Sequence, residues 1–213
     1  MVMTPFQTHR GLVASLERAN VDTDQIIPKQ FLKSIARTGF GENLFYDWRY
    51  LADGKPNPEF PLNAPAFRGA SILVTGNNFG CGSSREHAVW AIQQYGFRAV
   101  IAPWGMRGGT RVPAFADIFR SNCAKNSLLA VELAEPEVNE IFRMVDRYPG
   151  LEATVNLEEQ RVTLHLAEEV SFHFEIDPSV KEHLLHGVDH IGLTLKHVEA
   201  IRAFEARHDA QMY

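Results

Sequence analysis

The stretch Gly76–His87, which reads Gly-Asn-Asn-Phe-Gly-Cys-Gly-Ser-Ser-Arg-Glu-His, constrains the fold more than any other part of the chain. Ala70–Thr75 before it is apolar and rich in β-branched residues, which predicts a buried strand. Arg85–Tyr95 after it repeats apolar residues at the spacing of one helical face. Ser83 and Glu86 have the spacing of a capping box, so we expect the helix to begin within the serine pair. The stretch therefore predicts a strand, a glycine-rich loop and a helix N-terminus.

The predicted loop has the features of an anion-binding site. Glycines allow the backbone to approach a ligand closely, and the first N–H groups of a helix favour a negative charge. Ser83 and Ser84 add hydroxyl groups, and Arg85 adds a guanidinium that fits a carboxylate or a phosphate. The alternative is a capped helix whose Arg85 pairs with a surface acid. The motifs G-x-G-x-x-G and Gly-Lys-Ser/Thr are absent, so the loop carries no nucleotide-binding fingerprint.

Several separated motifs together resemble one known family. The segment Gly80–Ala88 resembles the serine–arginine motif in the swivelling domain of the aconitase superfamily. Further segments in the same order make the chain similar to the small subunits of 3-isopropylmalate dehydratase, and the resemblance extends from about Phe6 to Arg207. These segments are Asn20–Pro28, Arg37–Phe40, Tyr95–Arg98, Phe115–Phe119 and Ile191–Leu195.

The resemblance implies both a fold and an activity. The fold is an α/β swivelling β/β/α domain: a parallel-rich sheet with flanking helices, a small antiparallel portion and a helical C-terminal tail, with residues 1–213 as one domain. The activity is that of a hydro-lyase subunit, which converts 2-isopropylmalate to 3-isopropylmalate by dehydration and rehydration in leucine biosynthesis. The partner is a separate large subunit that forms a heterodimer with this chain and carries a [4Fe–4S] cluster. Alternatives are a related subunit acting on homoaconitate, citramalate or a dimethylmalate, or a non-catalytic anion-binding regulatory module.

The resemblance also assigns roles to the loop. Ser83 is the expected catalytic residue, because the first serine of this pair acts in the superfamily as an alkoxide that removes a proton beside a carboxylate. Ser84 and Arg85 are the expected substrate-binding residues. Helix N–H groups together with Arg85 can stabilise negative charge on the serine and the substrate, so the assignment is physically reasonable.

A second segment, Pro28–Trp48, alternates aromatic and basic residues around a Thr-Gly-Phe-Gly centre. In the family that the chain resembles, this region is a flap that closes over the substrate and carries a recognition arginine. Arg37 is the residue that matches this role, and Lys33 is a weaker candidate. Without the resemblance, the same pattern fits a packed surface excursion.

Two groups of residues could bind a metal, but their patterns are incomplete. Asp22 and Asp24 could begin a calcium loop, yet the glycine and the distal glutamate of that motif are missing. We therefore expect a structural turn near the site. His183, His186 and His190 could lie along one helix face, but a glycine interrupts the helix and no acidic or cysteine ligand accompanies them. We expect no metal site in this chain.

The chain has two cysteines, Cys81 and Cys123, which are too few to hold an iron–sulfur cluster. We expect both thiols to be free. A cysteine nucleophile at Cys81 with His87 as its base is the main alternative that is independent of the family. However, His87 lies about one turn inside the predicted helix, and no third group orients it. A serine hydrolase is also a weak interpretation, because the G-x-S-x-G elbow is absent.

Composition excludes several classes of protein. At 213 residues, with 45% hydrophobic residues, the chain can bury one good core. A net charge of −5 without a basic block argues against a nucleic-acid partner. No apolar run is long enough to span a bilayer, and the N-terminus lacks the pattern of a signal peptide. We therefore expect a cytoplasmic protein.

The segment Pro103–Pro113 departs from the family pattern by an apparent insertion of about ten residues. We expect a solvated loop here, with Arg107 and Arg111 pointing to solvent, although the two arginines could also reach an anion beside the serine loop. Elsewhere, β-forming residues and short apolar runs predict strands at Phe6–Leu16, Arg98–Ala102 and Leu128–Leu133, and a period of two predicts strands at Ala153–Leu157, Arg161–Leu166 and Val170–Ile176. Helices are expected at Gln30–Ala36, Phe115–Ala124 and Glu137–Arg147, and in the tail Pro178–Arg207, which is broken at Gly187 and near Gly192.

Overall fold

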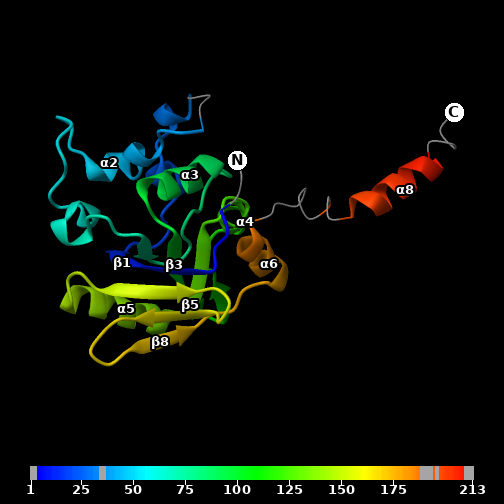
Figure 1. Cartoon of the computed structure of the whole chain (residues 1–213). Coiled ribbons are helices and arrows are strands. Elements are labelled where there is room, and N and C mark those ends of the chain that lie inside the picture. The colour runs from blue at the N-terminus through cyan, green and yellow to red at the C-terminus, as the bar shows by residue number, and fades with distance from the viewer. Residues whose placement is uncertain (1–3, 34–36, 188–193, 195–196, 209–213) are drawn as a thin grey trace.

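The computed structural model describes residues 4–33, 37–187, 194 and 197–208 (Figure 1). The strands are β1 (Thr8–Leu16), β2 (Ile72–Thr75), β3 (Ala99–Arg107), β4 (Thr110–Val112), β5 (Leu129–Ala134), β6 (Glu152–Asn156), β7 (Arg161–Leu164) and β8 (Val170–His173). The helices are α1 (Thr23–Ile26), α2 (Tyr46–Arg49), α3 (Glu86–Tyr95), α4 (Asp117–Lys125), α5 (Glu135–Arg147), α6 (Pro178–His186) and α8 (Val198–His208).

The strands form one sheet in the order β4-β3-β2-β1-β6-β7-β8, and β5 pairs with β3. β1 joins a parallel part to an antiparallel part. Its second half pairs in parallel with β2, with Val13 opposite Ile72, and its first half pairs antiparallel with β6, with His9 opposite Val155. The expected α/β sheet with flanking helices is confirmed, but the sheet is mixed rather than parallel-rich. Three strand pairs are parallel (β1–β2, β2–β3 and β3–β5) and four are antiparallel (β1–β6, β6–β7, β7–β8 and β3–β4), because the hairpin at β4 adds to the three antiparallel pairs on the other side of β1.

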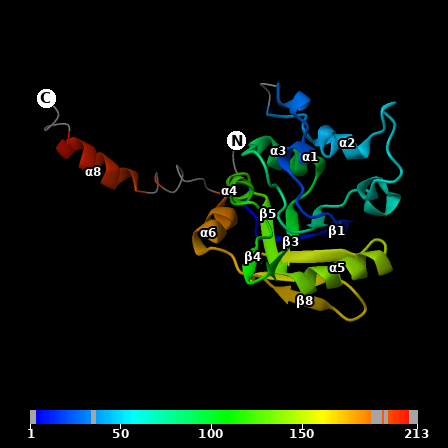
Figure 2. The same ribbon diagram turned by 180° about the vertical axis from the view of Figure 1, so that it is seen from behind.

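The sheet separates two hydrophobic cores, because successive side chains of a strand point to opposite faces. In β2, Leu73 faces the core formed with α3 and α4, whereas Ile72 and Val74 face the core formed with α5 and the antiparallel strands. Figures 1 and 2 show α3 and α5 on opposite sides of the sheet. The helix α3 therefore lies on one face, and the loop that precedes it begins where β2 ends.

The segment Pro103–Pro113 is a β-hairpin, so the prediction of a solvated loop was wrong. β3 continues to Arg107, the chain turns at two glycines with positive φ, and β4 returns with Met106 opposite Arg111. The paired glycines can adopt positive φ at little cost, which allows so tight a turn. The Arg107 guanidinium donates to Glu135 at 2.8 Å and that of Arg111 donates to Glu132 at 3.3 Å. Both arginines thus pair with acids of this chain.

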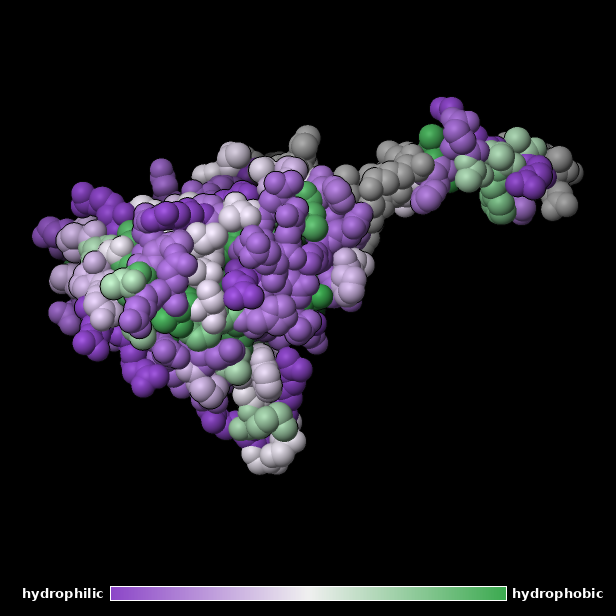
Figure 3. Space-filling view, turned by 60° about the horizontal axis from the view of Figure 1, so that its bottom comes forward, coloured by the Kyte–Doolittle hydropathy of each residue, from purple (hydrophilic) through white to green (hydrophobic). Residues whose placement is uncertain are grey.

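The C-terminal helix α8 lies apart from the body of the molecule in both ribbon views (Figures 1 and 2). None of its residues is buried, and Phe204 is 54% exposed. The space-filling view shows apolar side chains beside charged ones on this helix (Figure 3). The predicted helical tail is confirmed for the two helices α6 and α8; Gly187, with φ of 61°, ends α6. In the described residues, no helix is both long and apolar enough to cross a membrane.

Candidate active site

The glycine-rich loop between β2 and α3 is fixed by backbone hydrogen bonds to the segment that follows β1. The Gly80 N–H donates to the Val21 carbonyl at 2.7 Å, and the Thr23 N–H donates to the Cys81 carbonyl at 2.9 Å. Asp22 and Cys81 form an isolated parallel bridge between the same two segments. The loop and the residues around Asp22 therefore form one backbone unit, although they are far apart in the sequence.

Gly80 is the loop position where a side chain fits least. Its φ is +75°, and a Cβ atom there would lie 2.2 Å from the Phe119 ring. Both the left-handed backbone and the contact with the ring favour glycine. Glycine at this position thus allows the loop to pass closely over the Phe119 ring of α4 and still reach the N-terminus of α3.

The helix α3 begins at Glu86 rather than within the serine pair, so the predicted capping box of Ser83 and Glu86 was wrong. Arg85 is the N-cap residue, and its side chain makes no capping hydrogen bond. The Ser83 carbonyl instead accepts from the Thr23 hydroxyl at 3.0 Å and from the Arg85 N–H at 2.8 Å. The Glu86 carboxylate accepts from the Asn126 amide at 2.7 Å. The tertiary contacts of the loop therefore replace the local cap.

A capping box does occur, but at α1. The Gln25 N–H donates to the Asp22 carboxylate at 2.8 Å, and the Asp22 N–H donates to the Gln25 side-chain oxygen at 2.9 Å. This pair holds the first turn of α1 rigidly beside the serine loop. The expectation that Asp22 and Asp24 form a structural turn near the site thus holds for Asp22, whereas Asp24 has a different contact.

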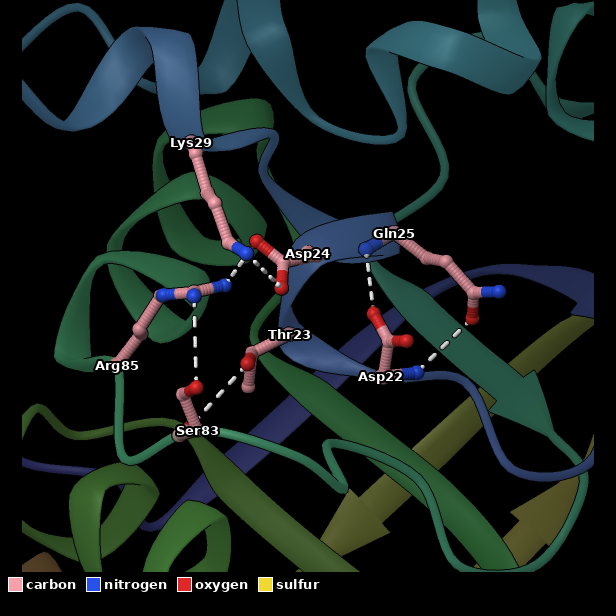
Figure 4. A network of polar contacts seen from close by, with 7 residues as sticks. All are labelled: Asp22, Thr23, Asp24, Gln25, Lys29, Ser83 and Arg85. Atoms are coloured by element: carbon pink, nitrogen blue, oxygen red, sulfur yellow. Dashed lines mark hydrogen bonds and ion pairs between the residues drawn. The ribbon is translucent and has the colours of Figure 1, made fainter.

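The Asp24 carboxylate pairs with the Arg85 guanidinium (Figure 4). The Arg85 side chain is 15% exposed, and its other terminal nitrogen donates to the Ser83 hydroxyl oxygen at 3.4 Å. Ser83 and Ser84 are themselves exposed. The second oxygen of Asp24 lies 3.6 Å from the ammonium of Lys29. The arrangement is an exposed serine hydroxyl beside a guanidinium, which a carboxylate 61 positions earlier in the chain keeps in place.

Within the described residues, Arg37 contacts α3 rather than this network. Its guanidinium is over the Trp90 ring, at 5.4 Å from the ring centroid, and its carbonyl accepts from the Gln94 amide at 2.8 Å. The side chain of Phe40 is 2% exposed and packs against the rings of His87 and Trp90. The expected flap is therefore anchored to α3 at Phe40.

The loop thus brings together three of the four residues that sequence reasoning selected. Ser83, Ser84 and Arg85 are consecutive, whereas Arg37 contacts the second half of α3. The side chain of Lys33 lies outside the described part of the chain. Sequence reasoning missed Asp24 and Lys29 as members of the network. The two aspartates of Asn20–Pro28 and the lysine that follows this segment were the signal in the sequence, and they indicated no partner.

The cysteine alternative finds no support in the geometry. Burial, and then the nearby Asp22 carboxylate, raise the pKa of the Cys81 thiol. The thiol donates to the Asn20 carbonyl at 3.4 Å, and the recorded ring contacts of His87 are with Phe40 and Trp90. Cys81 and Cys123 are both free, as expected, and burial raises the pKa of Cys123 well above its usual value. A thiol with a raised pKa is a poor nucleophile near neutral pH.

No metal-ligand group is present among the residues that the structure describes. Of the three histidines considered for zinc, His183 is buried, and His186 pairs with Glu182 at 3.3 Å. His190 lies outside the described residues. Two single cysteines also do not provide the three or four thiolates of an iron–sulfur cluster.

Comparisons with known proteins agree along the whole chain. Residues 3–136 match the family described as the aconitase C-terminal domain, and residues 191–212 match the C-terminal domain of the 3-isopropylmalate dehydratase small subunit. A 3-isopropylmalate dehydratase small subunit from Desulforapulum autotrophicum is 57% identical over 210 residues, which is 99% of this chain and 98% of that protein. A small subunit of the same name from Geobacillus kaustophilus is 56% identical over 97% of this chain and 98% of its own length.

The fold also has a counterpart among solved structures. A crystal structure of 3-isopropylmalate dehydratase from Methanocaldococcus jannaschii superposes with a TM-score of 0.61 at 23% identity, over 93% of this chain and 99% of that one. At this identity the likeness concerns the fold, whereas the close relatives identify the family. The chain belongs to the family of 3-isopropylmalate dehydratase small subunits.

Proposed function

We propose that this chain is the small subunit of a hydro-lyase that interconverts 2-isopropylmalate and 3-isopropylmalate in leucine biosynthesis. The observation that carries the proposal is the end-to-end identity of 57% with a named small subunit. The reaction removes a proton from C3 and the hydroxyl group from C2, which gives 2-isopropylmaleate and water. Readdition of water with the opposite orientation gives the 3-hydroxy isomer. The active unit is a heterodimer with a separate large subunit.

In this proposal Ser83 is the base that takes the proton from the substrate carbon. Its exposed hydroxyl lies beside the Arg85 guanidinium at 3.4 Å, where the positive charge stabilises the alkoxide form that accepts the proton and so becomes a hydroxyl group. The nearby N-terminus of α3 favours negative charge at the same place. Ser84 and Arg85 bind a carboxylate of the substrate, and Arg37 contributes from the flap. Asp24 keeps the Arg85 guanidinium directed at Ser83.

The residues of this chain do not fit a [4Fe–4S] cluster, because its described part offers two separate thiols and no group of metal ligands. We therefore infer that the large subunit holds the cluster, which acts as a Lewis acid on the hydroxyl group. The exposed position of Ser83 and Ser84 supports a site that a second chain completes. The free thiols are compatible with the cytoplasm, where we place the complex.

The decisive experiment is a reconstitution. The chain is mixed under anaerobic conditions with a cluster-bearing large subunit from the same source, and the absorbance of isopropylmaleate is followed. We expect turnover only in the mixture. Activity of the isolated chain would contradict the division of labour. Turnover of homoaconitate, citramalate or a dimethylmalate in place of isopropylmalate would assign the chain to a related hydro-lyase. Binding of anions without any turnover would favour a regulatory module.

A further inference from the structure

The Asp24 carboxylate interacts with two cationic side chains that differ greatly in solvent exposure. Arg85 contacts one oxygen and is 15% exposed, whereas Lys29 approaches the other oxygen at 3.6 Å and is 74% exposed. Figure 4 shows Lys29 coming from the segment after α1, and Arg85 coming from the segment before α3, with the Asp24 carboxylate beside the ends of both side chains. The two cations therefore reach the same point from separate parts of the chain.

The distance between Lys29 and Asp24 is too long for a hydrogen bond, so the contact is electrostatic only. As far as the described residues show, all three N–H donors of the ammonium are therefore available to a ligand. Exposed ion pairs of this kind contribute little to stability, and a lysine side chain is flexible. Lys29 can thus leave Asp24 at small cost, whereas Arg85 is held by Asp24 and faces Ser83.

The charges of the network are suited to a ligand with two carboxylates. Two cations and one carboxylate leave an excess of one positive charge beside Ser83. Arg85 alone is largely neutralised by Asp24, so a dianion that met only Arg85 would find no net positive charge there. Lys29 supplies the missing charge on the exposed side of the network. Arg37 makes its recorded contacts at Trp90 and Gln94, at a different part of α3.

We propose that Lys29 binds the second carboxylate of the substrate, the one that Arg85 does not hold. This inference rests on the proposed function, since it names how the same site selects a dicarboxylate. Asp24 orients Arg85 toward Ser83, and Lys29 moves from Asp24 to the substrate when the substrate enters. The site therefore discriminates between diacids and monoacids through a residue outside the serine loop.

The test compares K29M with the wild-type chain in the reconstituted complex. Charged hydrogen bonds of this kind are expected to change affinity about tenfold, so the KM for 2-isopropylmalate should rise about tenfold. The kcat should change little, because Lys29 does not contact the reacting carbon. K29R should restore most of the affinity. The matched control is K55M, which removes another exposed lysine that pairs with an aspartate, Asp53, at 2.9 Å, and should leave the KM unchanged.

Two inhibitors isolate the carboxylate itself. The diacid 2-isopropylsuccinate lacks the hydroxyl group, and the monoacid 2-hydroxy-2,3-dimethylbutanoate lacks the second carboxylate. In K29M, inhibition by the diacid should weaken about tenfold while inhibition by the monoacid stays constant. Equal weakening of both inhibitors, or a wild-type KM in K29M, overturns the inference. The same holds if K29M weakens only the association of the two subunits, as measured by sedimentation.

Failure of the proposed function gives a different result. In that case the wild-type complex does not turn over isopropylmalate at all. Calorimetric binding of 2-isopropylsuccinate and of the monoacid to the wild-type and K29M complexes then still decides the role of Lys29. A preference for the diacid that K29M abolishes supports the carboxylate contact, and no preference in the wild type overturns it.

Discussion

The Asp24 carboxylate holds the Arg85 guanidinium from a position 61 residues earlier in the chain, and Arg85 in turn donates to the Ser83 hydroxyl. The order Asp24–Arg85–Ser83 links a half-buried acid to an exposed hydroxyl group through one planar cation. Arg85 cannot rotate freely while Asp24 binds it, so the direction of its remaining donors is set before any ligand arrives. The candidate site is thus preorganised by a residue from α1.

Removal of the charge of Asp24 should therefore impair the reaction without unfolding the chain. In D24N, we expect kcat/KM of the reconstituted complex to fall by about 10- to 100-fold, since a charged hydrogen bond is lost. The control is D53N, which alters an exposed aspartate paired with Lys55. Steady-state kinetics with 2-isopropylmalate give the result. A D24N complex with the kcat/KM of the wild type would show that Arg85 needs no anchor.

The Ser83 hydroxyl should be required for chemistry and not for assembly. In S83A, we expect kcat to fall by about 10²- to 10⁴-fold, the usual contribution of a positioned general base. Binding of the large subunit, measured by size-exclusion chromatography, should stay unchanged because only an exposed hydroxyl is removed. S84A is the control, with a smaller loss that falls mainly on KM. Equal activities of S83A and the wild type would exclude Ser83 as the base.

Gly80 should be the most sensitive glycine of the site. In G80A, the Cβ atom would lie 2.2 Å from the Phe119 ring in addition to the cost of a positive φ. We expect the free energy of unfolding to fall by about 3 kcal/mol, from left-handed strain and overpacking together.

Gly54 provides a matched comparison for Gly80. Its φ is +79° and a Cβ atom at this position would have nothing within 4 Å, so G54A carries the backbone strain alone. We expect a loss of about 1 kcal/mol in G54A. Urea unfolding of both variants separates the two effects, and equal losses would mean that the Phe119 ring moves aside freely.

Acid should destabilise the fold partly through His9. Burial, and then the charge of Arg98, lower the pKa of His9, whose ring contacts the Ser71 hydroxyl at 2.7 Å. The unfolded chain therefore binds more protons at this residue between the lowered pKa and the usual value of about 6.5. Stability rises with pH across that window and is lost as the pH falls below about 6.5.

The variant H9Q should remove this part of the pH dependence. Urea unfolding between about pH 8 and pH 5 is expected to give a shallower slope for H9Q than for the wild type. Parallel slopes would show that His9 titrates alike in the folded and unfolded chains.

Cys81 should not take part in the chemistry, although it lies within the site loop. Its raised pKa leaves little thiolate near neutral pH, so reaction with iodoacetamide should be slower than that of a free cysteine. We expect C81S to retain most of the activity of the wild-type complex. If C81S lost as much activity as S83A is expected to lose, Cys81 would again be a candidate for the nucleophile.

Much of the local structure could be predicted because it depends on short spacings. Short apolar runs predicted β2 and β3, alternation predicted β6, and the helical spacing predicted α3, α4 and α5. The structure confirms these elements, although β3 continues past its predicted end at Ala102 to Arg107. Local predictions failed at two places, and at each of them a local signal was overridden by contacts with other parts of the chain. Ser83 has the spacing of a cap, but its carbonyl is bonded to Thr23 and Arg85. The glycine pair at 108–109 indicated a loop, yet it closes a hairpin.

The sequence by itself determined the strand, the glycine-rich loop, the helix and the placement of Ser83, Ser84 and Arg85 side by side, because neighbours in the chain cannot separate. The tertiary structure alone decided that Asp24 and Lys29 join them and that Arg37 lies over Trp90. The parallel pairing of β1 with β2 brings the segments after both strands to the same edge of the sheet. Such a pairing is set by the burial of two faces across the whole sheet, and no local spacing in the sequence encodes it.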